Sequence, residues 1–212
     1  MAAVGCRLSP QPTAAVAETA TIELPPPQLD GQMSLEEALA ARRSVRRYTD
    51  DPLTWDEIGQ LMWAAQGITR DWGGRTAPSA GALYPLEVYA VTAEGLYRYV
   101  PQEHQLIVSP GLGLGQALWE AGLKQDCIRD APVVFLIVAV YERTAVKYGD
   151  RAERYVHLEA GHAAQSLLLQ AAALDLGGVP VGAFYDQKVQ EALGLPDDQA
   201  PLYLIPVGHP AE

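Results

Sequence analysis

One long helical stretch in the second half of the chain limits the folds that this sequence can adopt. Residues 153–176 are helical in character, and residues 157–174 within them are apolar or small on nearly every side. A helix that is hydrophobic all round has to be buried all round. Because a chain of 212 residues has difficulty burying so long a helix alone, we expect a homodimer with this helix near its interface. The alternative is a monomer with the helix at its centre.

Shorter helices and strands fill the rest of the chain without alternating evenly. Capping-box patterns predict helices that begin at Ser34 and Thr54. Further helices are expected over 116–126 and 186–193, and strands over 86–92, 95–99, 105–108, 133–140, 179–184 and 202–207. This mixture predicts an α+β fold in which a central mixed or antiparallel sheet is surrounded by helices.

Composition and charge exclude several classes of function. The net charge of -11 argues against a nucleic-acid partner, which requires a basic face. The longest apolar run, residues 131–140, is too short for a membrane-spanning helix. Cys6 and Cys127 cannot form a zinc site by themselves, and His157 and His162 do not share a helix face, so we expect no metal.

The beginning of the chain differs in composition from the remainder. Residues 1–33 are rich in Pro and Ala and have no periodicity, which predicts a flexible arm before a folded domain over 34–212. Ala3 to Cys6 is similar to the end of a lipoprotein signal, but the charged and apolar regions that precede such an end are missing. We therefore expect a cytoplasmic protein, with an exported lipoprotein-like protein as the alternative.

Two segments stand out as candidate binding elements. Arginines and a serine cluster at Arg42, Arg43, Ser44 and Arg46, where guanidinium groups and a hydroxyl would converge on a phosphate. A solvated basic patch that pairs with nearby carboxylates is the alternative. The second segment, residues 75–89, has a run of small residues without a carboxylate, histidine or cysteine. It is either a plain connector or a place where a large flat group lies against the backbone.

Several motifs in the same order resemble the FMN-dependent nitroreductase family. The arginine cluster looks like the Arg-x-Ser-x-Lys/Arg opening of that family, and Pro78, Ser79 and Pro85 match its Pro-Ser loop. Residues 177–184 and 206–209 resemble its later flavin-contacting turn and its closing Pro-Val-Gly strand. Within the family, residues 64–69, 77–85 and 141–149 are most similar to the SagB-type dehydrogenase branch.

The resemblance implies a nitroreductase-like fold and an intertwined homodimer with two FMN sites at its interface. Backbone amides of the Pro-Ser loop and of the later turn would contact the flavin ring, and the arginine cluster would hold the phosphate. The implied cofactor-binding residues are Arg42, Arg43, Ser44, Arg46, Pro78, Ser79, Ala80, Gly81, Leu83, Pro180, Val181, Gly182 and Ala183.

The resemblance also implies an oxidoreductase with Lys147 and Tyr148 as catalytic residues. In azoline-oxidising SagB-type enzymes, a Lys-Tyr pair is implicated in removing a proton while flavin takes a hydride. The plainer interpretation is a loop lysine paired with Asp150 or Glu142. The substrate would be a small molecule or a peptide. The alternatives are an NAD(P)H-dependent nitroreductase or quinone reductase, in which NAD(P)H would be the reductant, and a non-catalytic flavin-binding scaffold for a partner enzyme.

Overall fold

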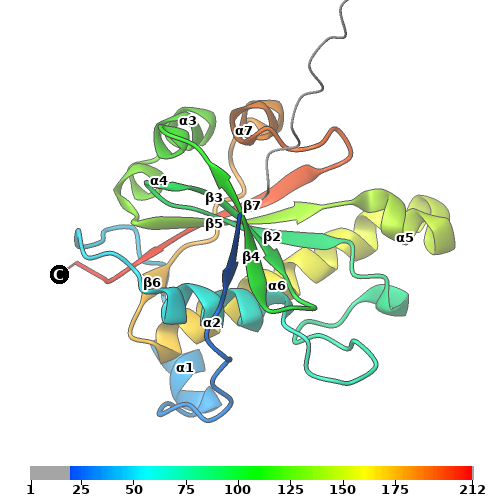
Figure 1. Cartoon of the computed structure of the whole chain (residues 1–212), viewed down its shortest axis with the longest axis horizontal. Helices are drawn as coiled ribbons and strands as arrows, with labels where there is room; N and C mark the ends of the chain where they lie inside the picture. The colour runs from blue at the N-terminus through cyan, green and yellow to red at the C-terminus, as the bar shows by residue number, and fades with distance from the viewer. Residues whose placement is uncertain (1–19, 212) are drawn as a thin grey trace, which may run out of the picture.

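A single seven-stranded sheet organises the protein in the computed structural model, which describes residues 20–211 (Figure 1). The strand order is β1-β4-β3-β2-β5-β7-β6, and every pair of neighbouring strands is antiparallel. The strands are β1 (Thr21–Glu23), β2 (Leu86–Val91), β3 (Gly95–Val100), β4 (Gln105–Pro110), β5 (Val133–Ala139), β6 (Gly177–Gly178) and β7 (Ala200–Gly208). The predicted central sheet is confirmed, and it is antiparallel throughout.

Helices cover both faces of this sheet (Figure 1). They are α1 (Leu35–Ala41), α2 (Trp55–Gln66), α3 (Leu114–Ala121), α4 (Asp126–Asp130), α5 (Tyr141–Tyr148), α6 (Ala152–Ala173) and α7 (Asp186–Leu193), with short 3-10 turns η1 (Ala80–Ala82) and η2 (Gly149–Arg151). Helices α1, α2 and α6 lie on one side, and α3, α4 and α7 lie on the other. The α+β class is therefore confirmed.

Strand β5 is buried on both faces because each face supports its own core. Its residues Val133, Phe135 and Ile137 pack with α2 and α6, while the intervening Val134, Leu136 and Val138 pack with α3, α4 and α7. Alternate side chains of a strand point to opposite faces of a sheet. Because this strand is covered on both faces, all of its side chains are apolar, which explains the uninterrupted apolar run in the sequence.

Phe135 offers a direct test of this arrangement. Its side chain is 0% exposed, and a Phe135→Ala change should lower the free energy of unfolding by about 3–5 kcal/mol because it opens a cavity in the core. Urea unfolding of the two proteins measures the difference. Val146→Ala, at a residue that is 80% exposed, should change stability by less than about 0.5 kcal/mol. Equal effects of the two changes on the free energy of unfolding would contradict the burial of β5 on both faces of the sheet.

Helix α6 confirms the predicted long helix, but not its complete burial within one chain. Val156, Ala160 and Leu167 lie in the core beneath the sheet. The opposite side leaves His162 and Gln165 open to solvent, and Leu158 is 55% exposed. A helix that looked apolar all round is thus buried on one side and carries a partly apolar exposed side in the single chain.

Local capping chemistry formed the first two helices as expected. Ser34 Oγ accepts from the Glu37 amide at 3.2 Å, and the Glu37 carboxylate accepts from the Ser34 amide at 2.8 Å. Thr54 and Glu57 repeat the arrangement at 3.2 and 2.7 Å. Each box satisfies amides that the first helical turn leaves without partners.

Three predicted element boundaries were wrong. Within 179–184 the expected strand is replaced by an isolated bridge between Val181 and Leu204, because β6 ends at Gly178 and Pro180 has no amide to donate. The helix expected over 116–126 is divided into α3 and α4, since Leu123 and Lys124 have φ angles of 58° and 57°. Residues 141–148 form α5 instead of a loop.

The sheet also begins earlier in the chain than the predicted domain boundary at Ser34. Strand β1 pairs with β4, and Leu24 is buried in the core formed with α2 and α6. Residues 1–19, and Cys6 with them, lie outside the described residues. Among residues 20–211, no helix is long and apolar enough to cross a membrane.

Candidate functional site

The loop before β2 meets the end of α5 at Gly81. Gly81 has a φ angle of +64°, and a Cβ built on it would lie 3.0 Å from both Lys147 Nζ and Tyr148 Oη. Glycine tolerates this backbone conformation without strain and leaves room for the two side chains. The structure therefore brings together one predicted cofactor-binding residue and both predicted catalytic residues.

Hydrogen bonds hold this loop in its conformation. Ser79 Oγ accepts from the Tyr84 amide at 2.8 Å, and the Ser79 carbonyl accepts from the Ala82 amide at 3.1 Å. Arg143 Nη1 donates to the Tyr84 carbonyl at 3.2 Å, which ties the loop to α5. The loop is thus an ordered element held by its own polar groups and not a loose connector.

Lys147 and Tyr148 are the last two residues of α5. The Tyr148 ring packs edge-on against Tyr155 of α6 at 5.0 Å between centroids, and Lys147 Nζ lies 5.5 Å from the centroid of the Tyr148 ring. In the described part of the chain, no carboxylate lies within 4.0 Å of the lysine amine. The expected alternative, a lysine paired with Asp150 or Glu142, does not form.

Glu159 is a residue of this region that the sequence interpretation missed. It lies on α6, is 3% exposed, and its Oε1 has no hydrogen-bond partner among the described residues. Burial raises the pKa of this carboxyl to about 7, although Ser79, the Ala80 amide and the charge of Arg75 act to lower it. A lone carboxylate inside the apolar stretch 157–174 was the signal in the sequence.

Replacing Glu159 with Gln should stabilise the protein in a pH-dependent manner. Because the folded-state pKa is raised, the folded state loses stability as pH rises from about 4.5 to about 7. Above that range, Glu159→Gln should raise the free energy of unfolding by roughly 3 kcal/mol, and near pH 4.5 it should have little effect. Urea unfolding across this pH range measures the difference.

The exposed Glu153 of α6 provides the matched control. Glu153→Gln should leave the pH dependence of stability unchanged, because its carboxylate is in water. A Glu159→Gln protein that is less stable than the natural protein at every pH would show that the interactions of the carboxylate with Ser79, the Ala80 amide and Arg75 outweigh the cost of its burial.

The arginine cluster lies beside β6. Arg42 and Arg43 line a cleft of about 150 Å³ together with Gly177 and Gly178. Ser44 forms a parallel bridge with Gly178, whose carbonyl accepts from the Val45 amide at 3.1 Å. A Cβ on Gly177 would come within 2.5 Å of the Val45 side chain, so glycine is required for this approach. The structure thus joins the cluster to the start of the predicted flavin-contacting turn.

The remaining turn residues follow β6 directly. Val181 exchanges backbone hydrogen bonds with Leu204 at 2.8 and 3.0 Å, and the Ala183 carbonyl accepts from Gln125 Nε2 at 2.9 Å. Pro180, Gly182 and Ala183 are exposed. Arg46 is exposed as well, two residues beyond the bridge at Ser44.

The predicted cofactor residues form two separate groups within one chain. The cleft of Arg42 and Arg43 contacts Leu168 and Ala172, near the end of α6, whereas the loop of Gly81 lies against Glu159 nearer its beginning. Ala172 lies thirteen positions after Glu159, which is about 20 Å along a helix. Figure 1 shows α1 and η1 at opposite ends of α6.

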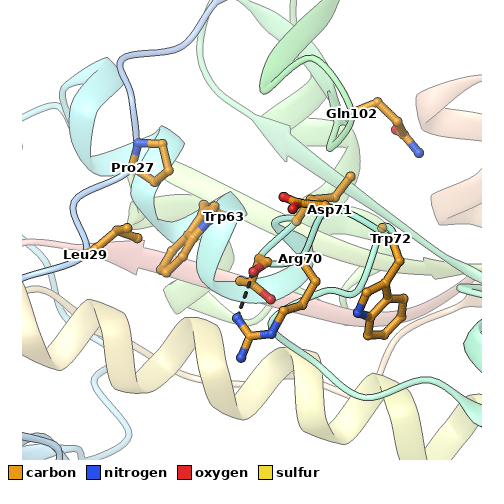
Figure 2. Close-up of a pocket in the computed structure, with 10 residues that line it drawn as sticks. Pro27, Leu29, Trp63, Arg70, Asp71, Trp72 and Gln102 are labelled. Atoms are coloured by element: carbon orange, nitrogen blue, oxygen red, sulfur yellow. Dashed lines mark hydrogen bonds between the residues drawn. The ribbon is translucent and has the colours of Figure 1, made fainter.

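A separate open cavity lies near the end of α2 (Figure 2). Its volume is about 860 Å³, and it is lined by Leu29, Trp63, residues 68–73 and Gln102. Trp72, which is 72% exposed, stands at its side. None of the predicted cofactor-binding or catalytic residues lines it.

Among the residues that the structure describes, there is no group of three metal-ligating side chains. Cys127 is a buried free thiol whose pKa is raised by its burial. The polar groups that the candidate site does contain are backbone amides, guanidinium groups, a lysine, a tyrosine and one buried carboxyl.

Comparisons with known proteins identify the family to which the chain belongs. The Nitroreductase family model matches residues 39–209. The Methanocaldococcus jannaschii protein named "Putative nitroreductase MJ1384" is 44% identical over 198 residues, which are 91% of this chain and 98% of that protein. The Bacillus subtilis protein named FMN reductase is 26% identical over 189 residues, which are 82% of this chain and 65% of that protein.

Solved structures share the fold over nearly the whole chain. A crystal structure of a protein from Ralstonia eutropha has a TM-score of 0.82 and 30% identity, and the match covers 97% of this chain and 96% of that one. The NADPH:FMN oxidoreductase from Vibrio harveyi has a TM-score of 0.64 at 23% identity, with 84% and 69% covered, which shows a common fold. The chain belongs to the nitroreductase family, has the nitroreductase-like fold, and is an oxidoreductase.

Proposed function

We propose that this oxidoreductase is FMN-dependent and oxidises a small-molecule or peptide-derived substrate, in the manner of SagB-type dehydrogenases. The observation that carries the proposal is the meeting of Gly81 with Lys147 and Tyr148. An amine and a phenol hydroxyl, both able to exchange protons, lie directly against a bare, ordered stretch of backbone. Bound FMN would supply N5 as the hydride acceptor there.

The residues present fit such a cofactor. The loop offers a glycine with positive φ and small neighbours, so a flat ring can approach the backbone closely. Amides of Ser79, Ala80, Gly81 and Leu83, with the turn 180–183, would bind the ring, while Pro78 shapes the loop. Guanidinium groups and the hydroxyl of the cluster 42–46 would bind the phosphate at the cleft beside β6.

A homodimer follows from the separation of these two groups. Because they lie about 20 Å apart along α6, we infer that each flavin is held by the loop of one protomer and the arginine cluster of its partner. The exposed Leu35 and Leu39 of α1 and Leu158 of α6 support this inference, since α1 packs on α6 and these leucines are open to solvent in the single chain.

The pair at the end of α5 would move the proton that accompanies hydride removal. Lys147 Nζ would accept the proton from the substrate carbon, because the described chain offers its amine no carboxylate partner. The Tyr148 hydroxyl would orient the substrate, with its ring fixed by packing against Tyr155. The backbone of the loop at Gly81 would set the distance between the substrate and the side chains of Lys147 and Tyr148.

NAD(P)H-driven reduction of nitroaromatics or quinones is the second candidate. It is favoured by relatives whose names are FMN reductase (NAD(P)H) and NADPH-flavin oxidoreductase. In this case NAD(P)H would dock where the substrate does, and the two half-reactions would alternate.

Anaerobic stopped-flow mixing of the yellow holoenzyme distinguishes the two candidates. Bleaching of the flavin by a thiazoline-containing peptide, faster than by NADPH, is the result expected from the first. Rapid bleaching by NADPH without any by the peptide would favour the second. A protein that binds FMN but whose flavin is bleached by neither compound would be a scaffold. A protein that does not bind FMN would contradict both candidate activities and the scaffold alternative.

A further inference from the structure

A cavity lined by arginines opens beside β2 and β3, apart from the residues proposed to hold FMN. Its volume is about 290 Å³. The charged side chains that line it are Arg75, Arg98, Arg143 and Glu87, and its amide side chains are Gln66 and Gln102. The cavity is large enough for a small polar group, and it contains three guanidinium groups but one carboxylate.

Glu87 neutralises part of this charge. Its Oε2 lies 3.5 Å from Arg98 Nη1, and its Oε1 accepts a short hydrogen bond from Arg143 Nη2. Both carboxylate oxygens are therefore engaged with Arg98 and Arg143. The Glu87 side chain is 11% exposed and is shielded from water, whereas the side chains of Arg98 and Arg143 are 37% and 41% exposed and reach the solvent.

Arg75 has no carboxylate partner of its own. Its Nη1 donates to Gln66 Oε1 at 2.9 Å, and its guanidinium carbon lies 4.4 Å from the centroid of the Tyr84 ring. Among the described residues, no Asp or Glu oxygen lies within 4.0 Å of it, and its Nε and Gln66 Nε2 have no hydrogen-bond partner. Burial lowers the pKa of Arg75.

An uncompensated guanidinium in such surroundings is unfavourable unless an anion joins it. Glu87 and, more weakly, Glu159 act on Arg75 only from a distance, and burial raises the pKa of the Glu159 carboxyl, which disfavours its charged form. The cavity therefore has an excess of positive charge that the chain does not satisfy. A carboxylate fits it well because guanidinium groups bind carboxylates through paired hydrogen bonds.

The neighbouring cavity indicates what such a carboxylate is attached to. Gln102 lines both the arginine cavity and the larger cavity of Figure 2. The larger cavity presents Leu29, Trp63 and Trp72. We propose that the arginine cavity binds the carboxylate of a small apolar acid whose body lies in the larger cavity. This site requires neither bound FMN nor the hydride transfer proposed above.

Isothermal titration of the full chain tests the site without measuring turnover. Phenylacetate, phenylacetamide, acetate and inorganic phosphate serve as probes, each with FMN-loaded and FMN-free protein. Phenylacetate should bind about tenfold tighter than either its amide or acetate, because each lacks one of the two contacts. Phosphate binding as tight as that of phenylacetate, or no preference for phenylacetate over its amide, would overturn the proposal.

Three variants locate the binding site. Arg75→Gln should weaken phenylacetate binding about tenfold, since a charge-assisted contact is lost. Glu87→Gln should tighten binding severalfold, because it releases Arg98 and Arg143 from their carboxylate. A general disturbance of the structure would weaken phenylacetate binding in both variants and would not tighten it in one of them. If Arg75→Gln does not fold, Arg98→Gln takes its place, with the same direction of change expected.

Arg129→Gln is the matched control. Arg129 pairs with Asp126 and Asp130 on α4, away from the cavity, and its removal should leave phenylacetate affinity unchanged. Equal weakening by Arg129→Gln and Arg75→Gln, or weaker binding in Glu87→Gln, would show that the probe binds elsewhere. Either result would overturn the assignment, whether or not the protein transfers hydride.

Discussion

A Lys147→Ala variant should retain FMN and lose about two to four orders of magnitude in the rate of thiazoline oxidation. A positioned general base contributes about a hundredfold to ten-thousandfold to such a step. The truncation removes the amine that lies next to the Gly81 backbone, but it leaves the loop and its hydrogen bonds intact. Steady-state oxidation of a thiazoline-containing peptide to the thiazole, with flavin content measured in parallel, gives the result.

A second reaction of the same variant separates a proton-transfer role from damage to the site. Flavin bleaching by NADPH requires no base, so Lys147→Ala should change that rate by less than about threefold if the lysine acts in proton transfer. Tyr148→Phe should reduce peptide oxidation and keep the ring packing with Tyr155. Equal losses in both reactions would assign Lys147 a structural role.

Lys188 provides the matched control for this experiment. Lys188 lies on α7, and its Nζ lies 4.6 Å from the centroid of the ring of Tyr185, the N-cap residue of that helix, which repeats the lysine-on-tyrosine contact outside the proposed site. Lys188→Ala should leave both reactions unchanged. A Lys147→Ala protein that oxidises the peptide at the natural rate would exclude the lysine as the base.

The Arg42→Gln, Arg46→Gln double variant should bind FMN about a hundredfold less tightly or worse. Each charge-assisted hydrogen bond to phosphate is worth about 1.5–3 kcal/mol, and the two changes remove bonds from both arginines. Titration of FMN fluorescence with the apoprotein measures the dissociation constant. Arg42 lines the cleft beside β6 and Arg46 is exposed, so the core should tolerate both changes.

Riboflavin distinguishes the phosphate from the ring in this titration. It lacks the phosphate, so its affinity should be nearly the same for the natural protein and the double variant. If riboflavin and FMN lose affinity equally, the arginines act on the fold or the ring and the phosphate is held elsewhere. Arg129→Gln should leave the affinity for FMN as it is.

The sequence predicted those parts of the fold that depend on near neighbours. Ser34 and Thr54 began helices because a side chain and an amide three residues apart can satisfy each other wherever the chain lies. The buried strand at Val133 and the long helix ending at Ala173 were visible because apolar side chains follow the period of the element. The family motifs, in the right order, gave the fold correctly.

The prediction failed where a distant contact decided the outcome. Val181 forms one bridge with Leu204 instead of a strand, and the apparently all-apolar α6 has an exposed side at Leu158. Glu159 looked like an incidental charge in an apolar helix. Its environment depends on the loop that packs on it, which lies about eighty residues earlier in the chain.

The amino-acid sequence by itself determined most of the helices and strands, and the family. Tertiary structure alone decided that Gly81 meets Lys147 and Tyr148, that Glu159 is buried beside that loop, and that Arg75 faces a cavity without a carboxylate partner. The physical reason is that helix and strand formation depend on interactions a few residues apart. Proximity and desolvation depend instead on which distant segments pack together.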